Sequence, residues 1–306
     1  MKTAFIFPGQ GAQYPGMGRE FSETIPVSRR AYETAESVCK MDIAKLCFQK
    51  DDRLNQTEYT QIAMLVTSSA MLMALEERGI HPDICAGLSL GEYGALVAAG
   101  IMRYEDACRV VRQRGILMQE AVPSGGAMAA VLGVEQSVVE RICEETEGIV
   151  EPANYNCPGQ LVISGEEAAV ERAAEALRQS GARRVVPLKV SGPFHSSMLK
   201  EAGKKLEKVL EPVVLQSGTV PYVANVTART VCDISQVKPL LARQVSSSVR
   251  WEQSVCTMLE QGVDTFVEIG PGRTLSGFVR RIDRNAAVYN IEKPEDIETF
   301  ERIWRR

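Results

Sequence analysis

The sequence lacks the features that mark several large classes of protein. It has no run of 18 consecutive apolar residues, which a membrane-spanning helix would need. A net charge of −4 and a pI near 5.5 argue against a general nucleic-acid binder. Only two histidines occur, and no Cys/His cluster has the spacing of a zinc site. Residues 1–8 are too short for a signal peptide. We therefore expect a cytoplasmic protein with no metal, no membrane contact and no nucleic-acid partner.

The sequence also predicts that the protein has no disulfides. The eight cysteines are scattered, mostly within apolar patterns, and no C-x-x-C pair occurs. We expect them to be buried thiols in a reducing cytoplasm. The composition is otherwise ordinary for a globular protein, with 45% hydrophobic and 24% charged residues in a chain of 306. That length suffices for one large domain or for two.

The patterning predicts α/β structure with an insertion. A strand over 4–7, helical spacing over 58–78, a strand over 84–86 and helices over 90–99 and 104–120 open the chain. A loop follows the first strand, but Tyr14 occupies the third glycine position of G-x-G-x-x-G, so the dinucleotide fingerprint fails. Near the end, strands over 222–225 and 265–269 and a helix over 251–261 resume the α/β pattern.

The stretch 127–190 has its own order. Strands are expected over 127–132, 149–155, 160–164 and 185–190, helices over 136–146 and 166–180, and a turn over 156–159. The order β-α-β-β-α-β is that of a ferredoxin-like unit, whose ends lie close together. We predict a discontinuous α/β-hydrolase-like catalytic domain with a mostly parallel sheet, residues 1–123 and 192–306, and an inserted ferredoxin-like domain, residues 124–191.

The segment Gly87-Leu88-Ser89-Leu90-Gly91 fits G-x-S-x-G between a predicted strand and a predicted helix. In that motif the glycines let strand and helix approach, and the serine sits on a tight turn with its hydroxyl exposed. The following N–H can point at an oxyanion. The alternative is a glycine-rich turn in which Ser89 only caps a helix.

A serine nucleophile needs a base, and elimination selects His195. His81 lies at the other end of the strand that leads to Ser89, roughly 26 Å away at about 3.3 Å per residue. His195 lies in a loop at the return from the insertion, where function tends to collect. A purely structural histidine is the alternative.

Counting along the helices brings Arg114 level with Ser89, about ten residues up one helix and ten down the next. A guanidinium there can grip a carboxylate with two parallel hydrogen bonds. A solvated helix face is the other reading, and counting alone leaves the two open.

Six motifs together resemble the malonyl-CoA:acyl carrier protein transacylases of bacterial fatty acid synthesis and the acyltransferase domains of polyketide synthases. They run in order along the chain: FPGQGAQ (7–13), GLSLGEY (87–93), RQRG (112–115), GAMAA (126–130), NYN (154–156) and GPG (270–272). The resemblance covers essentially the whole chain and implies the same inserted ferredoxin-like domain.

The resemblance implies a role for each matching position. Ser89 would carry the malonyl ester, His195 would act as general base, and Arg114 would bind the malonyl carboxylate. The oxyanion hole would be formed by the N–H groups of Gln10 and Leu90. The main-chain carbonyl of Gln244 would orient His195. Phe194 and Asn156 would bind the substrate.

The implied activity is that of an acyl-carrier-protein S-malonyltransferase. Malonyl would pass from malonyl-CoA to the phosphopantetheine thiol of acyl carrier protein by a ping-pong mechanism that needs no cofactor. One departure is Leu88, where the family usually has histidine. Because leucine there resembles hydrolase-like members, a carrier-linked acyl hydrolase is the alternative enzyme. A catalytically silent scaffold is the alternative outside enzymes.

Carrier proteins of this kind are acidic, so a basic surface is expected. The candidates flank the return to His195: Arg183, Arg184, Lys189, Lys200, Lys204 and Lys205. Ordinary solvated charges are the alternative. Nothing in the sequence demands more than a monomer, and a free-standing chain of this length favours fatty acid over polyketide synthesis.

Overall fold

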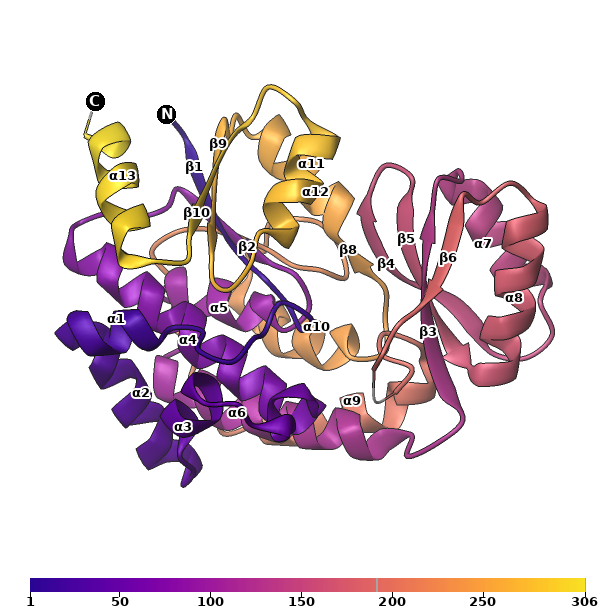
Figure 1. The fold of residues 1–306 in the computed structure, drawn as a ribbon, viewed down its shortest axis with the longest axis horizontal. Coiled ribbons are helices and arrows are strands. Elements are labelled where there is room, and N and C mark those ends of the chain that lie inside the picture. Colours follow the sequence, from indigo (N-terminus) through magenta and orange to yellow (C-terminus); the bar gives the residue numbers. More distant parts are fainter. Residues whose placement is uncertain (191, 306) are drawn as a thin grey trace.

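The computed structural model describes residues 1–190 and 192–305, in which two five-stranded sheets organise the chain (Figure 1). The first sheet has the order β10-β9-β1-β2-β7, and its neighbouring strands all pair in parallel. Its strands are β1 (Thr3–Phe7), β2 (Ile84–Gly87), β7 (Tyr222–Val223), β9 (Thr265–Ile269) and β10 (Ala287–Ile291). The expectation of a mixed α/β fold with a parallel sheet is thus confirmed.

The first sheet is covered by helices on both faces. Phe5 and Phe7 of β1 belong to one hydrophobic core, and Ala4 and Ile6 belong to another. Strands that are apolar on both sides are typical of parallel sheets buried in this way. One face is covered by α11 (Trp251–Glu260) and α12 (Thr274–Ile282). The core on the other face is built with α1 (Arg19–Thr24), α2 (Pro26–Cys39), α3 (Ile43–Phe48), α4 (Thr57–Glu77), α5 (Gly91–Ala98), α6 (Tyr104–Ala121), α9 (Lys200–Leu210), α10 (Val237–Gln244) and α13 (Pro294–Trp304).

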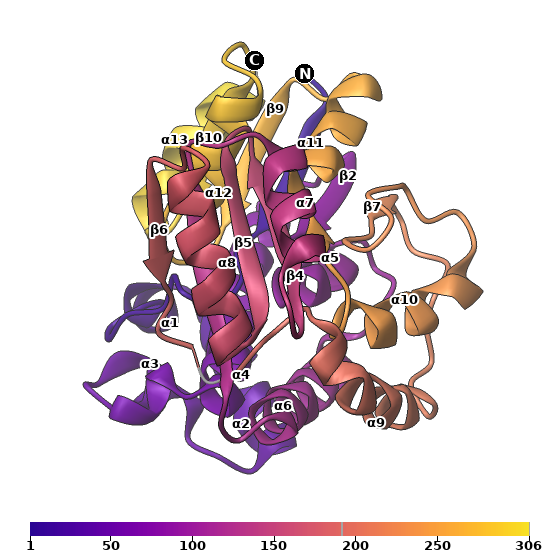
Figure 2. The same ribbon diagram turned by 90° about the vertical axis from the view of Figure 1, so that its right-hand side faces the viewer.

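The second sheet stands beside this body (Figures 1 and 2) and has the order β6-β3-β5-β4-β8. Its members are β3 (Gly126–Leu132), β4 (Val150–Cys157), β5 (Gln160–Glu166), β6 (Arg184–Pro187) and β8 (Val249–Arg250). The first four pair antiparallel, whereas β8 is parallel to β4. The outer face packs against α7 (Gln136–Glu145) and α8 (Glu167–Gln179). Strand β8 comes from late in the chain, directly before α11, so it connects the second sheet to the helices that cover the first.

The inner face of the second sheet points at the first. Tyr155 belongs to the outer core, whereas its neighbours Asn154 and Asn156 line a cavity between the two sheets. This alternation follows from the two-residue period of a strand. The fold therefore places polar side chains of the second sheet opposite the carboxyl ends of β1 and β2.

Several expected elements differ from the observed ones. The turn predicted over 156–159 is only Pro158 and Gly159, because Asn156 and Cys157 continue β4. The strand predicted over 185–190 ends at Pro187; beyond it, Leu188 and Val190 line the cavity. The strand predicted over 222–225 is β7, two residues long. Eight observed elements were not predicted from the sequence: α1, α2, α3, α9, α10, α13, β8 and β10. Short 3₁₀ turns complete the described chain: 52–55, 197–199 and 234–236.

None of the helices in the described residues has the length and apolar character needed to cross a membrane. The eight cysteines are free thiols. Five of them are buried as expected, but Cys39 and Cys256 are half-buried and Cys232 is exposed.

Candidate active site

Ser89 occupies a strained turn between β2 and α5. Its φ is 55°, in the left-handed region that non-glycine residues rarely adopt. The flanking glycines are required by close packing. A Cβ on Gly87 would lie 2.0 Å from the carbonyl carbon of Gly91, and one on Gly91 would lie 2.0 Å from the carbonyl oxygen of Phe7. The turn therefore has the geometry that the G-x-S-x-G pattern predicts.

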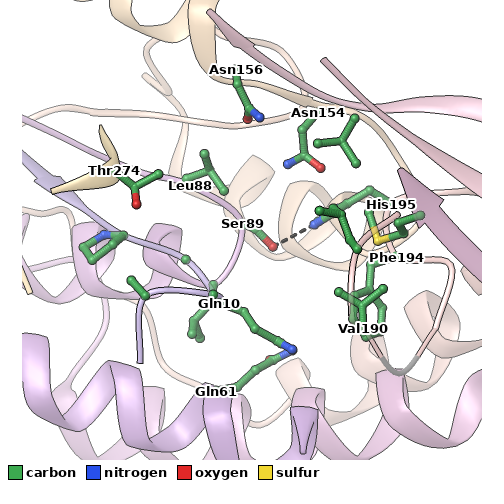
Figure 3. Close-up of a pocket in the computed structure, with 18 of the residues that line it drawn as sticks. Gln10, Gln61, Leu88, Ser89, Asn154, Asn156, Val190, Phe194, His195 and Thr274 are labelled. Carbon is green, nitrogen blue, oxygen red and sulfur yellow. Dashed lines mark hydrogen bonds between the residues drawn. The ribbon is translucent and has the colours of Figure 1, made fainter. Parts of the chain in front are cut away.

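His195 approaches Ser89 from the loop that precedes α9 (Figure 3). Its Nε2 lies 2.7 Å from Ser89 Oγ, and its Nδ1 lies 2.8 Å from the main-chain oxygen of Gln244. A carbonyl oxygen can only accept, so Nδ1 carries the hydrogen and Nε2 presents its lone pair to the serine hydroxyl. This is the tautomer that a general base requires. The orienting group is a carbonyl and not a carboxylate.

The surroundings of His195 keep the imidazole neutral. Burial, and then the positive charge of Arg114, lower its pKa from the usual 6.5 to about 4. At neutral pH the ring is therefore able to take up a proton. The backbone at His195 is itself in the left-handed region, with φ at 60°.

Arg114 lies beside Ser89, and its side chain is completely buried. Its Nη2 donates to Ser89 Oγ at 3.2 Å and to Gln244 Oε1 at 2.8 Å, while Nη1 donates to Gln61 Oε1 at 2.6 Å. Among the described residues, no carboxylate forms a salt bridge with this guanidinium. Its direct hydrogen-bond partners are all neutral groups. A carboxylate on a bound acyl group would give this buried cation a directly hydrogen-bonded anion.

Two main-chain donors face the same space. The N–H groups of Gln10 and Leu90 belong to residues that line the cavity, and neither donates to any described residue. Leu90 directly precedes α5, so its N–H points out of a helix start. Free backbone donors next to a nucleophile are what an oxyanion hole needs.

The cavity itself has a volume of about 240 Å³ and lies between the two sheets (Figure 3). Phe194, which is 6% exposed, forms part of its wall next to His195. Asn156 lies across the cavity from Ser89, and Leu88 lies beside the serine (Figure 3). Seven of the eight site residues predicted from the sequence line this cavity. The eighth, Gln244, lies behind it and is hydrogen-bonded to His195 and Arg114.

Three further side chains, not predicted from the sequence, hold this arrangement. Asn225 accepts a hydrogen bond from the Ser89 N–H at 2.6 Å and donates to the Gly87 carbonyl at 2.6 Å, which clamps the turn. Gln61 and Glu92 are buried in α4 and α5. Gln61 is one of several polar residues of α4, so nothing in the sequence distinguished it from the others.

The six basic candidates do not form one surface. Arg184 begins β6, and Arg183 and Lys189 lie just before and after that strand. The other three lysines belong to the first half of α9, away from β6 in both views (Figures 1 and 2). All six are exposed. Lys189 lies between Leu188 and Val190, which line the cavity, whereas Arg183 and Arg184 lie at the other end of β6, where Arg184 pairs with Leu132.

Enzymes that transfer acyl groups through a serine ester have a serine hydroxyl on a strained turn, hydrogen-bonded to a neutral imidazole. The chain belongs to the acyl transferase domain family, whose sequence profile matches residues 4–292. It is 44% identical over 302 residues to the malonyl CoA-acyl carrier protein transacylase of Bacillus subtilis, covering 97% of this chain and 95% of that protein.

Solved structures are similar over the whole chain. The malonyl CoA-acyl carrier protein transacylase of Clostridium perfringens is 42% identical, with a TM-score of 0.96 over 100% of this chain and 98% of its own. A malonyl-transacylase solved in complex with its type II polyketide acyl carrier protein is 39% identical, with a TM-score of 0.95 and 98% of each chain covered.

Proposed function

We propose that this protein is an acyl-carrier-protein S-malonyltransferase that moves malonyl from malonyl-CoA to the phosphopantetheine thiol of acyl carrier protein. The observation that carries the proposal is the contact of Ser89 Oγ with both His195 Nε2 and Arg114 Nη2, at 2.7 and 3.2 Å. The nucleophilic oxygen is therefore in direct contact with both its base and a cation that can bind a carboxylate. The names of the relatives, all malonyl transacylases, agree with this reading.

The first half-reaction acylates Ser89. His195 Nε2 takes the hydroxyl proton while Ser89 Oγ attacks the thioester carbonyl of malonyl-CoA. The N–H groups of Gln10 and Leu90 donate to the oxyanion that forms. When the tetrahedral intermediate collapses, the C–S bond breaks, and the coenzyme A sulfur leaves with the proton held by His195.

The second half-reaction repeats these steps with the carrier thiol. His195 takes the thiol proton, the sulfur attacks the malonyl ester, and the C–O bond to Ser89 breaks. The proton then returns to Ser89 Oγ, which restores the free enzyme. Neither half-reaction changes an oxidation state, so the chemistry calls for no cofactor, and a single chain supplies all the groups.

Selectivity for malonyl follows from two residues. Arg114 offers its charge to the malonyl carboxylate, which an acetyl group lacks. The ring of Phe194 fills the wall beside His195 and leaves little room for a substituent on the α-carbon. Asn156 presents an amide to the same space from across the cavity (Figure 3).

We assign residues 1–123 and 192–306 to an α/β-hydrolase-like catalytic domain and 124–191 to an inserted ferredoxin-like domain. Residue 191 itself lies outside the described residues. The strand order β6-β3-β5-β4 with two helices on one face supports the assignment. The two connections run close together, because a Cβ on Gly126 would lie 2.3 Å from Cδ of Pro193. The boundary is not strict, since β8 joins the second sheet from outside the insertion.

The acidic carrier would dock on the β6 group of basic residues, defined as Arg183, Arg184 and Lys189. Lys189 of this group adjoins the cavity wall through its neighbours Leu188 and Val190, whereas Lys204 of α9 is paired with Glu201 at 2.6 Å. A docked carrier must deliver its thiol into the cavity. Proximity therefore favours the β6 group over α9.

Intact-mass spectrometry tests the function directly. The protein is incubated briefly with malonyl-CoA, acetyl-CoA or methylmalonyl-CoA, and then with holo acyl carrier protein. We expect a malonyl adduct that is absent in Ser89→Ala and that moves to the carrier thiol. An adduct lost to water instead would favour the carrier-linked hydrolase, for which Leu88 beside the nucleophile is the motivating feature. No adduct from malonyl-CoA would refute the transferase.

A further inference from the structure

Gln244 is the residue through which the parts of the site are connected. It is completely buried at the end of α10. Its main-chain oxygen accepts from His195 Nδ1, and its side-chain Oε1 accepts from Arg114 Nη2, both at 2.8 Å. Its Nε2 donates to the main-chain oxygen of Ser89 at 2.9 Å. One residue thus contacts the nucleophile, the base and the carboxylate-binding cation.

The direction of the Gln244 amide matters for the cation. The two ends of a side-chain amide have nearly the same shape, but one accepts hydrogen bonds and the other donates them. A guanidinium only donates, so Arg114 is held only when Oε1 faces it. If the amide were reversed, its NH₂ would face the guanidinium, and Arg114 would lose a hydrogen bond within a buried site.

Glu92 lies at the far side of that amide. Its side chain is buried, with the residue 1% exposed in the first turn of α5. Oε2 accepts from Gln244 Nε2 at 2.7 Å and from the Asn225 N–H at 3.2 Å. Oε1 has no hydrogen-bond partner among the described residues. Nothing in the proposed mechanism uses this buried carboxyl group.

The charges of Glu92 and Arg114 act on each other across Gln244. Burial raises the pKa of Glu92 to about 7, and the hydrogen bonds from Gln244 and Asn225 and the charge of Arg114 oppose that rise. An ionised carboxylate is acceptor-only, so it holds the NH₂ end of the amide toward itself and the oxygen toward Arg114. The chain Glu92–Gln244–Arg114 is in effect an ion pair bridged by an amide.

We propose that Glu92 is a positioning residue for acyl-group selection, which through the Gln244 amide holds the Arg114 guanidinium ready for the acyl carboxylate. The inference rests on the proposed function. Because only an acyl group with a carboxylate uses Arg114, loss of Glu92 weakens loading of malonyl more than loading of acetyl. Any effect passed to His195 through the Gln244 main chain lowers both alike and leaves their ratio unchanged.

The test is the ratio of kcat/KM values for loading of Ser89 by malonyl-CoA and by acetyl-CoA, measured at pH 8, above the raised pKa of Glu92. For Glu92→Gln, which removes the negative charge that orients the Gln244 amide and adds a competing NH₂ donor, we expect this ratio to fall about tenfold. The matched control is Glu268→Gln. Glu268 is another buried glutamate of the same body and accepts from the N–H groups of Leu275 and Ser276. Its loss should lower stability without changing the ratio.

A double-mutant cycle separates action through the amide from a general packing effect. In a Gln244→Met background, Glu92→Gln should change the ratio by less than about twofold, since the connection is already broken. An unchanged ratio in the single variant, or a full additional effect in the Gln244→Met background, would overturn the inference. If the unaltered protein forms no malonyl adduct, it is the proposed function that fails, so the two failures are distinguishable.

Discussion

Replacing Arg114 by methionine should convert a malonyl-selective site into one that no longer distinguishes acyl groups by charge. The guanidinium can offer two parallel hydrogen bonds to a carboxylate, each worth about 1.5–3 kcal/mol when charge-assisted. Losing both corresponds to about 3–6 kcal/mol, or on the order of 10² to 10⁴ in kcat/KM for loading by malonyl-CoA. Loading by acetyl-CoA, which makes no such bonds, should change by no more than about fivefold.

The same substitution has a cost in stability that must be separated from its effect on activity. Gln61 and Gln244 would each keep a buried oxygen with no donor, at about 1–3 kcal/mol apiece. Thermal unfolding therefore accompanies the loading assay, which follows adduct formation by quenched intact-mass spectrometry. Arg112→Met is the matched control: Arg112 is on the same helix but pairs with Glu58 at 2.8 Å, away from Ser89. Equal losses for malonyl and acetyl in Arg114→Met would refute the assignment of Arg114 as the carboxylate anchor.

Three further predictions follow from the site. Because the lowered pKa of His195, about 4, keeps the ring neutral, the rate of Ser89 loading by acetyl-CoA, which does not use Arg114 or Glu92, should hold down to about pH 5 and fall as pH drops through 4; a fall centred near 6.5 in rapid-quench assays would contradict this. Phe194→Leu should raise the kcat/KM ratio of methylmalonyl-CoA to malonyl-CoA about tenfold, the effect of relieving one methyl clash, and no change would remove Phe194 from the selectivity wall. Reversing Arg184 and Lys189 to glutamate should raise the KM for acyl carrier protein about tenfold while loading from malonyl-CoA stays constant; if reversal of Lys204 and Lys205 gives the same increase, the carrier does not dock at β6.

The nucleophile turn was predictable because most of its determinants lie within five consecutive residues. Gly87 is needed where strand and helix start meet inside the motif, and only Gly91 also depends on a distant neighbour, the carbonyl oxygen of Phe7 in β1. The order of elements in 124–191 was predictable for a similar reason, since helix and strand periods show over short windows. His195 could be selected only because the chain has so few histidines.

Asn156 shows where local reading fails. A polar Asn next to Pro158 and Gly159 suggests a turn, yet Asn156 continues β4 and faces the cavity. A polar strand residue that faces a cavity and a turn residue have the same local signature. Which of the two applies depends on the cavity opposite, and that is a property of the assembled fold.

The sequence by itself determined the elbow carrying Ser89, the α/β patterning and the choice of His195 as base. Only the tertiary structure decided how Arg114 is held, why the pKa of His195 is low, and that Glu92 lies behind Gln244. The hydrogen bonds between Gln244 and its partners Glu92 and Arg114 span 152 and 130 residues of chain. Nothing within its own helix shows which partner each of these polar residues meets. Burial and proximity, which set both charge and hydrogen bonding, arise only when the helices pack together.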